Sequence, residues 1–101
     1  MKMLVITAIQ MFEEDILKML RENNVNAFSS TELVGYGNKK ATSLDDNWFG
    51  GSNGKYQSML FFAFLPESSV EGVFNAVEEF NGKQKTQSRV HISVLNVEKS
   101  N

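Results

Sequence analysis

Residues 59–66 read MLFFAFLP, a run that is apolar at every position before Pro66. Its length is typical of a strand, and proline ends a strand because it has no backbone N–H to donate. A strand with one face in water should alternate between apolar and polar side chains. This run does not alternate, so the sequence predicts that Phe61 and Phe62, which point to opposite faces, are both covered.

Three further runs around this segment are rich in β-branched or apolar residues and have the length of strands. They cover residues 4–9, 27–34 and 90–97. With 59–65 they make four expected strands.

Two helical patterns alternate with these strands. The first begins with the acidic residues 13–15, which suit the positive end of a helix dipole, and ends at Asn23 and Asn24. The second begins with Ser68 and Glu71, which have the spacing of a capping box, and ends at residues 81–82. Its apolar stripe consists of Val70, Val73, Phe74, Val77 and Phe80.

The order of these elements is βαββαβ, which predicts one ferredoxin-like α+β domain over residues 1–101 with an antiparallel four-stranded sheet. Two helices cover one face of such a sheet and leave the other face open. Because the 59–65 strand is apolar on both faces, we predict that the open face is buried between subunits. The alternative is a monomer with an exposed apolar face.

A long polar segment, about residues 38–57, separates the second and third expected strands. Hairpin loops usually have about two to five residues, and a loop beyond about 12–15 is usually functional or disordered. This segment holds the single tryptophan, Trp48, beside Phe49. We predict that this pair anchors a protein partner, since tryptophan is frequent at interface hot spots. The alternative is that both side chains fold back onto their own or a neighbouring subunit.

Composition excludes several classes of function. The net charge is −2 without a basic stripe, so we expect no nucleic-acid binding. The absence of cysteine removes disulfides, thiolate metal sites and cysteine nucleophiles. One histidine, His91, with Asp45 and Asp46 in a polar loop, is a weak ligand set, so we expect no metal. No apolar run reaches about 18 residues and no signal-peptide pattern is present, so we expect a cytoplasmic protein without membrane insertion.

Residues 31–37, TELVGYG, resemble the end of the second strand in the PII family of nitrogen-regulatory signal-transduction proteins. Lys39 and Lys40 directly after this motif, the long loop in the same place and Pro66 at the end of the third strand extend the resemblance. It implies a homotrimer with small effectors bound in clefts between subunits. It also implies that a T-loop, about residues 37–56, docks on a protein target such as a membrane transporter. The CutA family shares this trimeric fold.

The chain departs from PII proteins at the phosphate-binding loop. Residues 81–91 read NGKQKTQSRVH and lack the Gly-Asp-Gly-Lys run that cradles ATP or ADP phosphates in that family, and the C-terminal arginines are missing. The resemblance therefore implies a small anionic ligand and leaves an adenine nucleotide as an open identity. The expected effector-binding residues are Gly35, Gly37, Lys39, Lys40, Lys83, Lys85 and Arg89. The alternatives are a glycine-rich strand exit and solvated basic turns.

Three functions remain. The first is a PII-like regulator that senses an anion and signals through its loop. The second is a ligand-independent interaction module, or a CutA-like module for metal tolerance. The third is a dimeric α/β-barrel enzyme that uses His91 beside the phenylalanines of 59–65. We expect no enzyme and no catalytic residue, because no acid or base is paired with His91 by spacing and no nucleophile elbow or phosphate loop is present.

Overall fold

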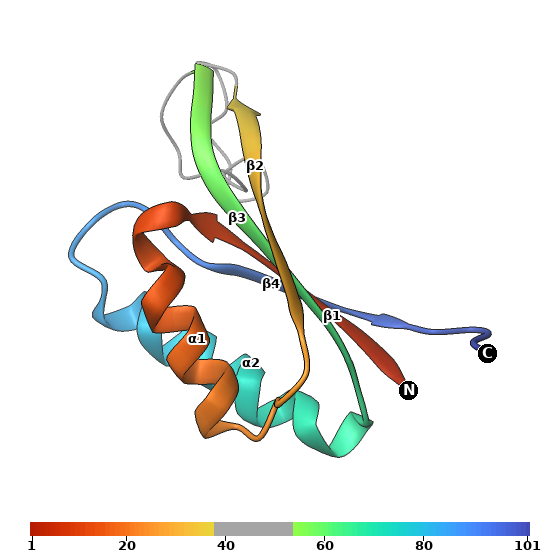
Figure 1. The fold of residues 1–101 in the computed structure, drawn as a ribbon. Coiled ribbons are helices and arrows are strands. Elements are labelled where there is room, and N and C mark those ends of the chain that lie inside the picture. The colour runs from red at the N-terminus through yellow and green to blue at the C-terminus, as the bar shows by residue number, and fades with distance from the viewer. Residues whose placement is uncertain (38–53) are drawn as a thin grey trace.

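The computed structural model describes residues 1–37 and 54–101. Within them, an antiparallel sheet of four strands carries two helices on one face (Figure 1). The elements in chain order are β1 (Lys2–Ile9), α1 (Glu13–Glu22), β2 (Ser29–Gly37), β3 (Gly54–Leu65), α2 (Val70–Lys83) and β4 (His91–Asn96). The strand order across the sheet is β2-β3-β1-β4. The predicted ferredoxin-like α+β fold is confirmed.

Strand β1 lies at the centre of the sheet and pairs antiparallel with both β3 and β4. The register places Leu4 opposite Ala63 and Ile6 opposite Phe61, and these side chains point towards the helices. Because side chains alternate along a strand, the same register turns Val5 and its neighbours to the other face. Between Ser58 and Leu65, the odd-numbered β3 residues therefore enter the core and the even-numbered ones face the other side. The helix-facing residues of both strands, all buried, are Leu4, Ile6, Ala8, Met59, Phe61, Ala63 and Leu65.

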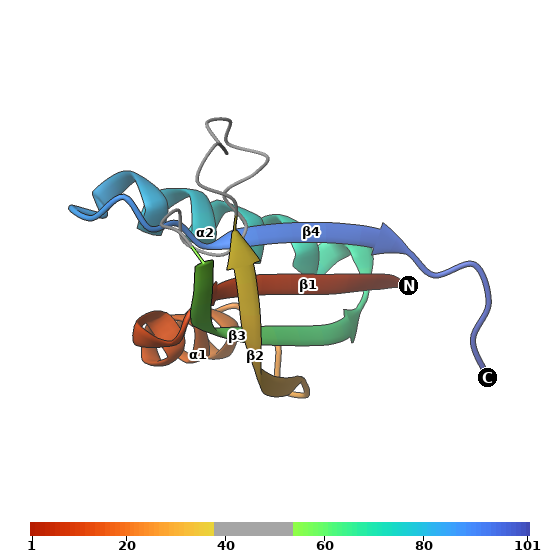
Figure 2. The ribbon, with the colours of Figure 1, turned by 90° about the horizontal axis from the view of Figure 1, so that it is seen from above.

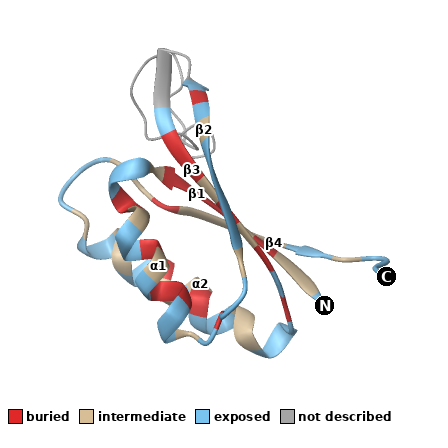
Figure 3. Ribbon diagram, viewed as in Figure 1, coloured by how far each residue is buried: buried red, intermediate tan, exposed pale blue. Residues whose placement is uncertain are grey.

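The two helices close the core by burying one stripe each (Figure 3). Ile16 and Leu20 on α1, and Val73 and Val77 on α2, are at most 1% exposed. Four fully buried aliphatic side chains contribute roughly 1.5–3 kcal/mol each to folding relative to exposure. The predicted apolar stripe of α2 therefore identified its packed face at Val73 and Val77, with Val70 and Phe80 partly buried against the core.

The C-terminal end of α1 packs closely against the N-terminal part of α2. Asn24 adopts a positive φ of 62°, which turns the chain out of the helix. The side-chain amide of Asn23 donates to the carbonyl of Met19 at 2.8 Å. A Cβ atom on Gly72 would lie 2.5 Å from the Asn23 Oδ1, so glycine leaves the space that this side chain occupies.

The start of α2 differs from the prediction. Residues Glu67–Ser69 form a 3-10 turn, and Ser69 stands at the N-cap without a side-chain capping hydrogen bond. The capping box predicted at Ser68 and Glu71 is therefore wrong. Pro66 begins the 3-10 turn one residue after the strand, so Ser68 is already inside a turn where the helix was expected to start.

The strand boundaries also differ from the prediction at the long loop. Strand β2 begins at Ser29 and continues through Tyr36 to Gly37, and β3 begins at Gly54. Gly37 pairs with Gly54, so the hairpin extends beyond the expected ends at residues 34 and 59. Residues 38–53, which connect the two strands and include Trp48 and Phe49, lie outside the described residues.

The observed ends of α1, α2 and β4 lie closer to the predicted ones. Helix α1 ends before Asn23, as expected, whereas α2 continues one residue past the predicted stop at residues 81–82. Strand β4 is one residue shorter at each end than the predicted 90–97. Among the described helices, none is long and apolar enough to cross a membrane.

We predict that Phe61→Ala lowers the free energy of unfolding by about 3–5 kcal/mol, because it removes a 1% exposed ring from the centre of the core. Met11→Ala is the control, since Met11 is equally apolar but 67% exposed, and its effect should stay below about 0.5 kcal/mol. Urea denaturation of both variants measures the difference. Equal losses in the two variants would contradict the placement of Phe61 in the core.

Candidate functional site

The sheet face opposite the helices is an uncovered, partly apolar surface among the described elements. Figure 1 shows both helices on one side of the sheet and no described element on the other. At one end of this open face Phe64 is 55% exposed and Leu95 is 47% exposed. Across β3, β1 and β4 the rows of this face are Phe64, Met3 and Leu95; Phe62, Val5 and Ser93; Leu60, Thr7 and His91; and Ser58 with Ile9.

The other end of the open face contains two buried hydroxyls. Thr7 is 7% exposed and Ser58 is 1% exposed, and neither hydroxyl oxygen has a hydrogen-bond partner within the described part of the chain. Ser58 lies between Ile9 on β1 and Leu33 on β2, and Thr7 lies between Leu60 and His91. Small side chains between larger ones lie below the surface of a sheet. A buried hydroxyl without a hydrogen-bond partner lowers the stability of the fold by about 1–3 kcal/mol. A partner for either hydroxyl would recover part of this loss.

The sequence alone did not indicate that Thr7 and Ser58 are special. Each is the one polar residue beside an apolar run, in LVITAI on β1 and before MLFFAFL on β3. That interruption is a visible signal, but it gains meaning only from the register. The pairs Ile9 with Ser58 and Thr7 with Leu60 bring the two hydroxyls to neighbouring positions on one face.

The glycines of TELVGYG lie in the β2–β3 hairpin. Gly35 is buried and pairs with Tyr56, and Gly37 pairs with Gly54 at the last described position before the loop. Lys39 and Lys40 lie outside the described residues, so their predicted role stays a prediction. The Gln10 side-chain amide donates to the Glu32 carboxylate at 2.9 Å. This hydrogen bond links the residue that follows β1 to β2.

The predicted basic residues after α2 lie in two different environments. Lys85 is exposed, whereas Arg89 is half-buried and donates through Nη1 to the carbonyl oxygens of Thr86 and Ser88. The Arg89 guanidinium thus packs on its own turn. Lys83 lies on the last turn of α2, where its ammonium pairs with the Glu79 carboxylate at 2.8 Å. We predicted that these three cations and the glycines of β2 form one site between subunits. Their positions in a single chain do not test this prediction.

The segment between α2 and β4 is fixed by Asn81. Its side-chain amide donates to the Val90 carbonyl at 2.8 Å, and its Oδ1 accepts the Val90 backbone N–H at 2.8 Å. The side chain therefore pairs with Val90 as a neighbouring strand would. Residues 84–89 are held between these anchored ends, so Lys85 and Arg89 lie on a short, tethered turn.

His91 lies opposite Thr7 in the register and is engaged in an interaction of its own. Within residues 1–37 and 54–101, no three His, Cys, Asp or Glu side chains are arranged to hold a metal ion. Asp45 and Asp46 lie outside those residues.

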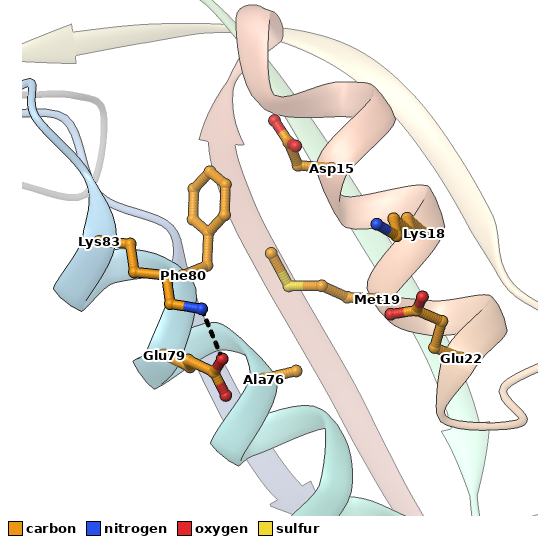
Figure 4. Close-up of a pocket in the computed structure, with 8 residues that line it drawn as sticks. All are labelled: Asp15, Lys18, Met19, Glu22, Ala76, Glu79, Phe80 and Lys83. Atoms are coloured by element: carbon orange, nitrogen blue, oxygen red, sulfur yellow. Dashed lines mark hydrogen bonds and ion pairs between the residues drawn. The ribbon is translucent and has the colours of Figure 1, made fainter.

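A groove on the other side of the molecule separates the two helices (Figure 4). Its volume is about 260 Å³, and it is open to solvent. Met19 and Phe80 point into the space between α1 and α2, and the Phe80 ring also meets Phe12 edge to face at 5.1 Å. The hydrogen bond and charge of Lys83 lower the pKa of Glu79, and Glu79 in turn raises the pKa of Lys83. The remaining residues that line the groove are Asp15, Lys18, Glu22 and Ala76.

The arrangement of sheet, helices and long hairpin is shared with solved structures. CPII from Thiomonas intermedia K12, a nitrogen regulatory PII-like protein bound to ADP, AMP and bicarbonate, is 19% identical, with a TM-score of 0.64 over 98% of this chain and 93% of that one. This chain adopts the fold of PII-like proteins. No model of a known family and no curated protein matches the sequence.

Two further structures with the PII-like fold match over nearly the full length. A DUF3240 family protein from Shewanella baltica is 14% identical, with a TM-score of 0.67 over 99% of this chain and 92% of that one. A protein from Thermus thermophilus described as PII-like is 17% identical, with a TM-score of 0.64 over 95% and 85%. At these identities the likeness concerns the fold, and it confirms the resemblance that TELVGYG and the long loop indicated.

We predict that Thr7→Val raises the free energy of unfolding of this chain by about 1 kcal/mol, because it replaces an unsatisfied buried hydroxyl by a methyl of similar volume. Thr31→Val is the control, since Thr31 is exposed and its hydroxyl donates to the Glu32 carbonyl at 3.2 Å. Urea denaturation at one protein concentration measures both. A loss of stability in Thr7→Val would mean that this hydroxyl already has a partner.

Proposed function

We propose that the chain is a cytoplasmic, PII-like regulatory protein. Three copies pack their open sheet faces together, a small anionic effector binds in the cleft between subunits, and residues 38–53 act as a T-loop that regulates a protein target such as a membrane transporter. The observation that carries this proposal is the apolar row of Phe64, Met3 and Leu95, with Phe64 and Leu95 exposed, on a sheet with the PII-like fold. In this proposal the chain acts as a regulator and none of its residues is catalytic.

The open face supports self-association because of its composition. Phe64 and Leu95 lie at the two edges of one row, with Met3 between them, and the row below it adds Phe62 and Val5. Apolar surface removed from water contributes about 25 cal/mol per Å². A contiguous exposed apolar patch of this kind usually marks an interaction site. An identical face on a second copy matches it without any further partner.

The proposed effector site combines the β2–β3 hairpin of one subunit with the basic turn of another. It comprises Gly35, Gly37, Lys39, Lys40, Lys83, Lys85 and Arg89. The tethered turn carrying Lys85 and Arg89 supports it, because the Asn81–Val90 hydrogen bonds hold two cations near the end of the sheet. CPII is described with ADP, AMP and bicarbonate, so these anions are the first ligands to test.

One observation favours a second candidate, the ligand-independent interaction module. Lys83 is already paired with Glu79, and the Arg89 guanidinium is folded onto the carbonyls of its own turn. Neither cation is held out towards a ligand in this conformation. In that case Trp48 and Phe49 would dock on a target regardless of any anion.

We predict that Phe64→Asp converts the proposed trimer into single chains, because it places an unpaired carboxylate in the apolar interface. Sedimentation velocity measures the change in mass. Met11→Asp is the matched control, since Met11 is 67% exposed and lies outside the sheet. Wild-type protein that already sediments as one chain, or a dissociation in both variants, would contradict the proposed assembly.

We predict saturable binding of at least one of ADP, AMP and bicarbonate to the assembled protein by titration calorimetry. Arg89→Ala and Lys85→Ala should each weaken it about tenfold, the usual loss for one charge-assisted hydrogen bond. Lys99→Ala is the control, because it removes the same charge from the exposed C-terminal segment. If neither these three ligands nor 2-oxoglutarate gave a binding signal, the result would favour the ligand-independent module.

A further inference from the structure

The groove between α1 and α2 is built from two matching stripes. On α1 the lining residues are Asp15, Lys18, Met19 and Glu22, and on α2 they are Ala76, Glu79, Phe80 and Lys83. Both sets have the spacing i, i+3, i+4, i+7, so each helix presents about two turns of one face to the space between them. Two such rows of side chains form a groove into which a third helix can insert its side chains.

The groove has apolar side chains at its bottom and charged side chains along its rims. Met19 is 8% exposed and lies at the bottom with Phe80 and Ala76, which are half-buried (Figure 4). Asp15 and Glu22 lie seven residues apart on the α1 rim, a rise of about 10 Å. A side chain inserted between the helices would therefore meet apolar atoms below. It would meet Asp15, Lys18 and Glu22 on the α1 side and the paired Glu79 and Lys83 on the α2 side.

Charge is unevenly divided between the helices and the rest of the chain. α1 and α2 together contain seven acidic and three basic residues, a net charge of −4. The whole sequence has a net charge of −2, so the remainder is positive by +2. The helical layer thus has the opposite sign to the sheet and loop segments, and its field attracts a cationic partner.

We propose that this groove is a second docking surface, which takes a basic amphipathic helix of a partner protein. One apolar side chain of that helix enters the space over Met19 and Phe80, and its lysines or arginines face Asp15 and Glu22. The proposal goes beyond the regulatory function proposed above and does not depend on it, because the groove lies on the helical side and the open sheet face on the other (Figure 2).

The dimensions of the groove set the expected strength of docking. A volume of about 260 Å³ accepts one large side chain, which is less than the several anchors of a tight helix-in-groove complex. Most of the attraction would come from partly solvated charges, which salt screens over about 10 Å at 0.1 M ionic strength. We therefore expect a weak contact that strengthens at low ionic strength.

The test uses the full-length protein, labelled with ¹⁵N, and a synthetic helical peptide of about 18 residues, long enough to populate a helix. The peptide carries leucines at helical spacing and lysines elsewhere, and a second peptide has glutamates in place of the lysines. Amide shifts should concentrate on α1 and α2 with the lysine peptide. They should be absent with the glutamate peptide.

Matched variants separate local docking from bulk charge. Asp15→Lys with Glu22→Lys should weaken binding of the lysine peptide about tenfold, since two rim contacts are reversed. Glu14→Lys with Glu78→Lys changes the net charge equally at exposed helix positions outside the groove and should change affinity about twofold or less. Ala76→Leu, which fills the groove without a change of charge, should also weaken binding about tenfold.

Three results would overturn the proposal. The first is equal weakening in the two double variants, which would make the attraction a property of total charge. The second is equal binding of the lysine and glutamate peptides. The third is a set of amide shifts centred on β1 and β4, which would place the peptide on the sheet.

Discussion

The pairing of β1 with both β3 and β4 fixes which side chains of the sheet enter the core and which face outward. Its register puts Leu4 and Ile6 beneath the helices and, by the alternation of a strand, turns Met3, Val5 and Thr7 outward. A slip of one residue would exchange these two sets and place the helix-facing residues on the open face. The buried core and the open face are therefore two results of one set of hydrogen bonds.

That single register divides the molecule into two surfaces of different character. The helix side is closed by the protein's own residues and carries an excess of acidic groups, with a small groove between the helices. The sheet side is apolar at the Phe64 and Leu95 end and has two unsatisfied hydroxyls at the Thr7 and Ser58 end. Contact with a second copy would cover the apolar end.

Much of the fold was readable from the sequence because local pattern and tertiary packing agree. MLFFAFL predicted a strand, and the apolar stripe of α2 predicted its buried side at Val73 and Val77. The capping box failed because Pro66 starts a 3-10 turn, a choice that depends on how β3 ends. The hairpin ends failed because pairing of Gly37 with Gly54 extends both strands beyond any local signal. Thr7 and Ser58 needed the register, whereas the Glu79 and Lys83 pair follows from i, i+4 spacing alone.

The central claim is that the open sheet face is covered by other copies of this chain. Methyl NMR with a dissolved paramagnetic agent tests it directly, because the agent relaxes only methyl groups that solvent can reach. In the assembled protein the account predicts that Leu95, which is 47% exposed in one chain, is protected, while Met11, at 67%, is strongly relaxed. Equal relaxation of the two residues would mean that the open face stays in water, and the account would be contradicted.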